Sequence, residues 1–452
     1  MKRGTVADRL LRTLGNRCLG ISCAALEKRV RSLRNENIGE QMDAPNLLSS
    51  SVTERTPRNI WEAYRTQFDV THSNLNRHYR ALKFANDRLT LKIVKYATFD
   101  DLAAAGIDVR RIDNGAVEFR PSKGKLPENW AIPQELISPE VATLHDALLL
   151  KNGAALLPDG YYCFHDASYA FENWRKKIVR GMVKFTDPKS DQILVRRPGL
   201  RKRIYGRCFS TRSDNYGNMG HFIHDILSRI YYEDIGTISP GREKIIPPLK
   251  MFPMQKFLFE RIYADYEIVE TPPRTALKVE ELLLPRNLCS DYGVNPAAIS
   301  SLAKRMRGIA APYAGSRKRK ICISRRDSQH GGVPGRKFVN MEAFEELMRK
   351  MGYDIVEVSK LGPEEQLELW ANATDVVGIH GAGMMNCLFM QPGASYTEIA
   401  GAPVVSDPDH FVAHSTARCA IIAGHKVSGL VGELDHDGNP VINMELLKEI
   451  LS

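Results

Sequence analysis

A glycine-rich stretch late in the sequence has the residue types and spacing best suited to chemistry. It reads GIHGAGMMNCLFMQPG over residues 378–393, and it places His380, Gly381, Ala382 and Gly383 between two apolar segments. Glycine lets a ligand or a neighbouring group come close to the backbone. If the second segment is a helix, its first N–H groups are unpaired and favour phosphate oxygens. The stretch therefore predicts a phosphate-binding loop; a turn that only packs a helix closely against a strand is the alternative.

The pattern differs from three better-known glycine loops. Asn386 stands where the dinucleotide fingerprint GxGxxG has its third glycine, which weakens a dehydrogenase interpretation. The Gly-Lys-Ser/Thr of a Walker A loop is missing. His-Gly-Ala-Gly is also similar to the oxyanion loop of lipases, but the sequence has no GxSxG elbow to supply the nucleophile.

Two charged residues on other expected strands complete the predicted phosphate site. Ligands bind at the carboxyl ends of strands in a parallel sheet. Arg325 directly follows the apolar run 320–324, and it could bind a diphosphate through a charge-assisted, bidentate contact. Glu398 lies near the end of the last expected strand and could accept hydrogen bonds from ribose hydroxyls. The predicted site for a diphosphate and its ribose is called the donor site below. It consists of Arg325, His380, Gly381, Ala382, Gly383, Asn386 and Glu398.

A histidine and a carboxylate in the first half of the chain have the spacing of a general base and its orienting partner. His221 and Asp225 are four residues apart and share one face of an expected helix. A carboxylate beside an imidazole fixes its tautomer and makes it a better general base. Asp225 as the base itself, and His221 as a residue that orients backbone or phosphate, are the alternatives. Asn215 and Tyr216, in the turn before this helix, are predicted acceptor contacts.

Alternating strands and helices must position these residues. Amphipathic and apolar periodicity predicts strands at 320–324, 353–359, 374–380 and 394–400 and helices at 341–352, 363–373 and 384–391. Such alternation is typical of a parallel sheet with helices on both faces. We expect the same arrangement in the preceding half, with a strand at 91–97, a helix at 99–106, a strand at 115–120 and a helix at 217–234. The predicted division is a helical, polar arm at 1–75, an α/β lobe at 76–295, a second α/β lobe with the glycine loop at 296–430 and a C-terminal helix at 431–452.

Composition narrows the function classes. The chain of 452 residues has a formal net charge of +10, and its basic clusters lack the interleaved aromatic residues of a nucleic-acid platform. No apolar run approaches the roughly 20 residues needed to span a bilayer. Eight scattered cysteines without metal-ligand spacing predict free thiols in a reducing compartment and no metal site. The basic arm suggests a cytoplasmic protein with a peripheral contact to an anionic membrane.

In combination, four segments resemble glycosyltransferase family 61, the capsular-polysaccharide and plant-xylan type of glycosyltransferase. They are the His-Gly-Ala-Gly stretch with its Pro-Gly ending and Glu398, the strand-then-arginine block ICISRRDS at 321–328, the Asn-containing helix and strand KFVNMEAFEELMRKMGYDIVEVSKL at 337–361, and NYGNMGHFIHDILSRI at 215–230. The last resembles the family's Asn-Tyr-x-His segment, with Asn218 and Met219 as two extra residues. The resemblance covers roughly residues 140–400.

The resemblance implies a GT-B fold, with a cleft between two Rossmann-like lobes: 76–295 would be the acceptor-side lobe and 296–430 the nucleotide-sugar-binding lobe. It also implies inverting, metal-independent transfer of a hexosyl or pentosyl group from a nucleotide sugar to a glycan or lipid-linked acceptor in polysaccharide biosynthesis. No cofactor is expected. A non-catalytic glycan-binding or assembly module on the same fold is the alternative, and a hydrolase that uses the His-Gly-Ala-Gly loop is a further one.

Overall fold

The computed structural model describes eleven stretches of the chain. They are residues 91–112, 135–151, 153–163, 183–187, 192–196, 201–213, 217–272, 275–289, 293–326, 338–401 and 412–452. The predicted arm at 1–75, the predicted strand at 115–120, and Asn215 and Tyr216 lie outside them. Contacts divide the chain into two compact units: one holds residues 1–98, 156–163 and 169–201, and the other holds 99–155, 164–168 and 202–452.

The first unit contains a small group of paired strands. β1 (Leu91–Ala97) pairs in parallel with β6 (Tyr161–Cys163) and antiparallel with β8 (Gln192–Arg196). β7 (Val183–Asp187) forms an antiparallel pair with β8. The predicted strand at 91–97 is confirmed. β5 (Ala155–Leu156) lies where the chain passes from the second unit to the first.

The N-terminal part of the second unit contains a mixed sheet. Its strands are β2 (Val109–Arg111), β4 (Glu140–Leu149), β9 (Arg201–Ser210), β10 (Lys244–Ile246) and β11 (Ala276–Pro285). β10 runs parallel to β9, whereas β11 and β2 both run antiparallel to β4. The prediction of a parallel sheet in this half is therefore wrong. The physical reason is that an apolar strand pattern does not encode the direction of pairing: β11 and β4 pair from Leu277 opposite Leu149 to Pro285 opposite Val141, although they lie more than 120 residues apart in the sequence.

Helical segments lie between the later strands of this sheet along the chain. They are α7 (Met219–His221), η3 (Phe222–Ile226), η4 (Leu227–Ile230), α8 (Tyr231–Asp234) and α9 (Pro253–Ile262). The predicted helix at 217–234 is helical but changes its winding, because η3 is a π-turn and η4 is a 3₁₀ turn. Such π-turns are frequent at functional sites. Two smaller pieces complete this part: α5 (Phe99–Ala104), and the parallel pair of β3 (Glu135–Leu136) with β12 (Gly293–Val294).

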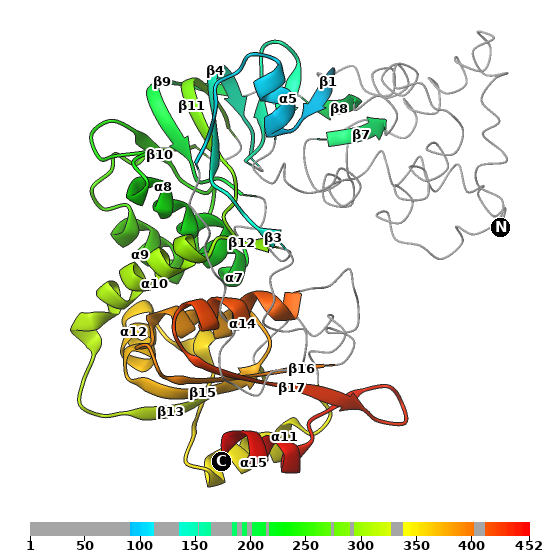
Figure 1. Ribbon diagram of the computed structural model, residues 1–452, viewed down its shortest axis with the longest axis vertical. Helices are drawn as coiled ribbons and strands as arrows, with labels where there is room; N and C mark the ends of the chain where they lie inside the picture. Colours follow the sequence, from blue (N-terminus) through cyan, green and yellow to red (C-terminus); the bar gives the residue numbers. More distant parts are fainter. Residues whose placement is uncertain are drawn as a thin grey trace, which may run out of the picture. The chain divides into compact units, whose positions relative to one another are not determined.

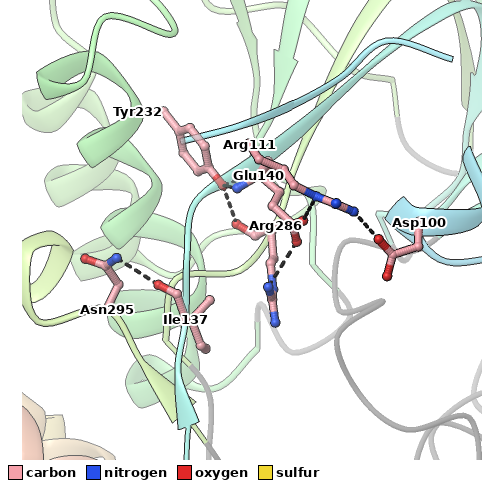
Figure 2. A network of polar contacts seen from close by, with 7 residues as sticks. All are labelled: Asp100, Arg111, Ile137, Glu140, Tyr232, Arg286 and Asn295. Carbon is pink, nitrogen blue, oxygen red and sulfur yellow. Dashed lines mark hydrogen bonds and ion pairs between the residues drawn. The ribbon is translucent and has the colours of Figure 1, made fainter. Parts of the chain in front are cut away.

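A polar network ties α8 to the sheet (Figure 2). The Tyr232 hydroxyl donates to the carbonyl of Glu140 at 2.7 Å and accepts from the Glu140 N–H at 3.2 Å. The Glu140 carboxylate in turn accepts from Arg111 at 2.8 Å and from Arg286 at 3.0 Å. Asn295 donates to the Ile137 carbonyl at 2.8 Å. These contacts connect β2, β4 and β11 to the helical segment that carries the predicted base.

The C-terminal part contains a second sheet in the order β14-β13-β15-β16-β17-β18. The strands are β13 (Arg319–Ile323), β14 (Asp354–Val356), β15 (Ala373–Ile379), β16 (Ser395–Gly401), β17 (Lys426–Leu434) and β18 (Pro440–Val441). All pair in parallel except β18, which runs antiparallel to β17. The predicted parallel sheet is confirmed here, and with it the α/β class.

Helices cover both faces of this sheet (Figure 1). They are α10 (Pro296–Ala310), α11 (Met341–Lys350), α12 (Pro363–Ala371), η7 (Ala382–Phe389), α14 (Val412–Ile422) and α15 (Met444–Leu451). In Figure 1, α12 and α14 lie on one face, and α11 and α15 lie on the other. Alternate strand residues serve the two faces: Ile321 joins one buried cluster, with α10, α12 and α14, and Cys322 joins the other, with α11 and α15.

The chain reverses direction in this sheet between β13 and β15. From β13 it passes through α11 to β14 on one side, and then through α12 to β15 on the other side. Doubly wound sheets bind ligands outside the carboxyl ends of the strands at such a switch point. Arg325 follows β13 and His380 follows β15, so both lie at this point.

Two further findings concern the described residues as a set. None of their helices combines the length and the apolar character required to cross a bilayer. Their cysteines are all buried free thiols, as predicted: Cys163, Cys208, Cys289, Cys322, Cys387 and Cys419.

Candidate functional site

The Arg325 guanidinium explains why residue 381 is a glycine. Its Nη1 donates to the His380 carbonyl at 2.8 Å. A Cβ built on Gly381 would lie 1.6 Å from that Nη1 and 2.9 Å from the guanidinium carbon. No side chain fits at 381 while Arg325 keeps this position. The structure thus brings together the arginine after β13 and the glycine loop after β15, as the sequence predicted.

The start of α7 packs against the same loop. A Cβ built on Gly220 would lie 3.5 Å from the Cα and 3.6 Å from the Cβ of Ala382. His221, which follows Gly220 directly, therefore lies next to the first residues of η7. The predicted base and the predicted phosphate loop, 160 residues apart in the sequence, are neighbours in the second unit.

Asn218 fixes this end of α7. Its side-chain oxygen accepts from the N–H of Gly220 at 2.8 Å and from the N–H of His221 at 3.4 Å. Such an N-cap satisfies donors that the first turn of a helix leaves unpaired. One of the two residues that interrupt the Asn-Tyr-x-His pattern is thus the cap that holds His221 in place.

His221 and Asp225 form the predicted pair. His221 Nδ1 lies 3.1 Å from Asp225 Oδ2, and the imidazole side chain is 21% exposed whereas the carboxylate is 5% exposed. His221 is therefore the member of the pair that a substrate can reach. The carboxylate holds one ring nitrogen, which orients the other.

His224 is a second imidazole on the same carboxylate. Its Nδ1 lies 2.5 Å from Asp225 Oδ1, and both residues are buried. Burial opposes charge on His224, but the Asp225 carboxylate outweighs it and raises the pKa of His224 to about 10. Burial likewise opposes charge on Asp225, yet His224 and His221 together hold its pKa well below the usual range. Asp225 therefore remains ionised and is a poor proton acceptor.

These three side chains could also hold a cation. The ligand atoms that His221, His224 and Asp225 offer all lie within 4.8 Å of one another. Two imidazoles and a carboxylate match the ligand preferences of Zn²⁺. The expectation of a site without metal remains a prediction.

Glu398 and His380 form a buried pair beneath the glycine loop. His380 Nδ1 is hydrogen-bonded to Glu398 Oε1, and the carboxylate is fully buried. Tyr396 donates to Glu398 at 2.5 Å, and Thr416 of α14 lies within 2.8 Å of both carboxylate oxygens. Glu398 is thus bonded to side chains of its own sheet and its covering helix.

Two further predicted donor residues, Gly383 and Asn386, belong to η7, which follows Gly381 directly. Asn386 on η7 is buried, and its side-chain oxygen has no hydrogen-bond partner among the described residues. A Cβ on Gly383 would meet Ile323 at an ordinary 3.6 Å, so this glycine is not required by space. The two predicted acceptor contacts, Asn215 and Tyr216, cannot be placed because they lie outside the described residues.

Sequence reasoning missed the roles of four side chains. His224 is not among the predicted site residues, yet both imidazoles of the segment that contains the π-turn η3 lie on the Asp225 carboxylate. Asn218 carried a usable signal, because asparagine before a helical segment is a frequent N-cap. Tyr396 also carried a usable signal, because it stands two residues before Glu398 and alternate residues of a strand share a face. Thr416 had no local signal, since only the packing of α14 on the sheet brings it to Glu398.

The structure therefore defines an α/β protein with a charged loop at the switch point of a doubly covered parallel sheet. The family model described as Glycosyltransferase 61 matches residues 219–397. The predicted resemblance is confirmed, and it supports a glycosyltransferase in general. The match begins at α7 and ends one residue before Glu398. A comparison with curated proteins found no match.

Proposed function

We propose that the protein is an inverting, metal-independent glycosyltransferase. It moves a hexosyl or pentosyl group from a nucleotide sugar to a glycan or lipid-linked acceptor in polysaccharide biosynthesis. The match to Glycosyltransferase 61 over residues 219–397 supports the general class. The finer assignment rests on the arrangement of the candidate site.

One observation carries this proposal: the start of α7 packs on the glycine loop, with Gly220 against Ala382. Glycosyl transfer requires a base at the acceptor hydroxyl and a stabilising group at the leaving diphosphate. His221 is a partly exposed imidazole on one side of this contact, and Arg325 lies over Gly381 on the other. Both requirements can therefore be met within one site.

The residues then have distinct roles. The acceptor oxygen forms a bond to the anomeric carbon of the donor from the face opposite the diphosphate, and its proton passes to His221. The bond between that carbon and the diphosphate oxygen breaks, and the oxygen keeps the electron pair. Arg325 and the N–H groups of 381–383 stabilise the charge that develops there. Asp225 orients His221, because its lowered pKa keeps it ionised.

The proposal extends to fold and surroundings. A GT-B-like arrangement would use 296–430 as the donor lobe, supported by the parallel sheet and its switch point. The mixed sheet in 76–295 departs from a second Rossmann-like lobe. The basic arm, outside the described residues, would contact an anionic membrane on the cytoplasmic side, where a lipid-linked acceptor is available.

The donor is identified by a thermal-shift screen of nucleotide sugars, followed by a transfer assay with the stabilising compound. Arg325→Ala and His221→Ala are expected to abolish transfer while the circular dichroism spectrum stays unchanged. Arg326→Ala is the matched control, because Arg326 points to Glu345 at 3.0 Å and is half exposed. Full activity in Arg325→Ala would refute the site assignment.

The same assay separates the alternatives. A non-catalytic glycan-binding module would bind glycan but would neither be stabilised by nucleotide sugars nor transfer sugar. A hydrolase would release free sugar or acid without an acceptor. Either result would replace the transferase proposal.

Metal independence is tested with the cluster around Asp225. We expect transfer to continue after exhaustive treatment with EDTA, because Arg325 and the glycine loop supply the positive charge. Loss of activity on chelation, with recovery on adding Zn²⁺, would show that His221, His224 and Asp225 hold a metal.

A further inference from the structure

The Glu398 carboxylate is the most deeply buried acidic group of the donor region. Its exposed fraction is 0%, so ligand hydroxyls do not reach it in this structure. Burying a charged carboxylate is costly unless hydrogen bonds satisfy it. Tyr396, Thr416 and His380 together supply those bonds. A carboxylate so completely held by protein groups serves the protein rather than a ligand.

The hydroxyl groups of Tyr396 and Thr416 are placed to donate to Glu398. Burial and the adjacent carboxylate raise the pKa of Tyr396 well above its usual value, so its phenol keeps the proton that it donates. The Thr416 hydroxyl lies 2.7 Å from one carboxylate oxygen and 2.8 Å from the other, so it fixes the plane of the group. The carboxylate therefore presents a defined oxygen to His380 Nδ1.

His380 connects the Glu398 carboxylate to the glycine loop. Its ring is held at Nδ1 by Glu398, and its backbone N–H donates to the Ile399 carbonyl at 2.7 Å. Its own carbonyl accepts from Arg325 Nη1 at 2.8 Å. A continuous chain of contacts thus runs from Tyr396 and Thr416 through Glu398 and His380 to the Arg325 guanidinium.

We propose that Glu398, held by Tyr396 and Thr416, is a positioning residue that fixes Arg325 for the diphosphate through His380. This inference rests on the proposed function, which assigns Arg325 to the diphosphate of a nucleotide-sugar donor. It replaces the ribose contact expected for Glu398 and adds Tyr396 and Thr416 to the residues on which donor binding depends. No covalent step is assigned to the network, since all its members act through hydrogen bonds.

The test measures inorganic pyrophosphate binding by calorimetry, and transfer with the nucleotide sugar found in the screen. Glu398→Gln keeps the shape of the side chain but places an amide donor where oxygens accept. Outer-shell partners of ligand-binding histidines at metal sites change affinity by about 10–100-fold, and we expect a loss of about 10-fold here. Thr416→Val is expected to weaken pyrophosphate binding by a smaller factor. Thr397→Val is the matched control, because Thr397 is a buried threonine on β16 that faces the opposite side of the sheet.

A double-mutant cycle distinguishes positioning from a general loss of stability. If Glu398 acts through Arg325, Glu398→Gln has little further effect on pyrophosphate affinity in the Arg325→Ala background. A ¹⁵N NMR spectrum of His380 gives a second measure, since the tautomer is set by the partner of Nδ1. We expect that Glu398→Gln changes this tautomer and Thr397→Val does not.

The two proposals fail in different ways. If the wild-type protein binds neither pyrophosphate nor any nucleotide sugar, the proposed function is refuted. If the wild type binds them and Arg325→Ala does not, but Glu398→Gln binds like the wild type, only the positioning role is refuted. Equal effects of Glu398→Gln with and without Arg325 would also refute it.

Discussion

At the scale of single residues, the glycines at the end of β15 and in the loop after it differ in the reason for each one. Gly381 leaves room for a charged group, because the Arg325 guanidinium occupies the place of its side chain. Gly378 leaves room for apolar packing, since a Cβ there would lie 2.6 Å from the Met384 sulfur. Gly383 has space for a methyl group. Only the first of the three connects the loop to the proposed chemistry.

Gly381→Ala tests this distinction. The added methyl group collides with the end of a flexible side chain, so Arg325 moves away and the fold remains. We expect pyrophosphate affinity to fall by about 10-fold or more, with a destabilisation of about 1 kcal/mol, the typical value for a single substitution. Gly383→Ala is the control and should bind like the wild type. Similar affinities in both variants would show that Arg325 does not need its present position.

The pair of His224 and Asp225 predicts how stability depends on pH. His224 has a folded pKa of about 10, above its ordinary 6.5. Its contribution to the free energy of unfolding is therefore complete below pH 6.5 and is lost as the pH rises toward about 10. Asp225 has a lowered folded pKa, so its contribution is present above pH 3.8 and is lost as the pH falls below it.

Urea unfolding at several pH values measures this effect. We expect the free energy of unfolding to decrease between pH 6.5 and about 10 in the wild type. The decrease should be smaller in the double variant His224→Gln/Asp225→Asn, which keeps a hydrogen-bonding pair without charge. An identical slope in both proteins would mean that His224 is neutral in the folded state.

At the scale of elements, short helical pieces place His221. α7 has three residues, and it is followed by the π-turn η3, so backbone propensity alone cannot hold it. Its position depends on the Asn218 cap at one end, the contact of Gly220 with Ala382, and the burial of η3 and η4 against the core. The cap is the most local of these and the easiest to remove.

Asn218→Ala removes the cap oxygen from the N–H groups of Gly220 and His221. Loss of an N-cap costs about 0.5–2 kcal/mol of stability. We expect a destabilisation in this range and a fall in kcat larger than any rise in KM for the donor, because the base is displaced while Arg325 is untouched. Asn218→Ser retains a capping oxygen and should recover most of the activity. If Asn218→Ser is as impaired as Asn218→Ala, the asparagine acts in some other way.

At the scale of the whole second unit, one hydrophobic cluster joins both sheets. It contains Phe209 and Ile226 from the N-terminal part, Leu302 of α10, and Ile321 and Phe389 from the C-terminal part. Helices α7 and α10 both contact η7. The parts that carry the predicted base and the predicted donor site therefore share a core, which holds them in register for chemistry.

Leu302→Ala tests whether this core makes the unit cooperative. The residue is fully buried on α10, and a leucine-to-alanine change in a core costs about 2–5 kcal/mol. We expect the amide protons of β11 and of β15 to lose protection together in native-state hydrogen exchange. Loss of protection in only one of the two strands would show that the two parts unfold separately.

The sequence alone determined most of the C-terminal part. Periodicity located β13, β15, β16, α11 and α12, because each buries one face or both in a regular layer, and that burial leaves a local pattern. It also predicted that Arg325 and the glycine loop lie close together, since each directly follows an apolar strand. The parallel sheet in the first part was predicted wrongly: strands of similar composition pair in either direction, and the turns between them decide the direction.

Only the tertiary structure decided what the individual side chains do. Glu398 was a plausible ligand contact in the sequence, but the packing of α14 on β16 buries it among Tyr396, Thr416 and His380. His224 contacts the same carboxylate as the predicted base, because the π-turn changes which residues share a face. The glycine at 381 is visible in the sequence, but the reason for it is not. The Arg325 guanidinium occupies the place of its side chain, and Arg325 lies 56 positions earlier in the chain. Periodic burial is encoded locally and can be read along the chain; contacts between distant residues exist only after the layers have packed.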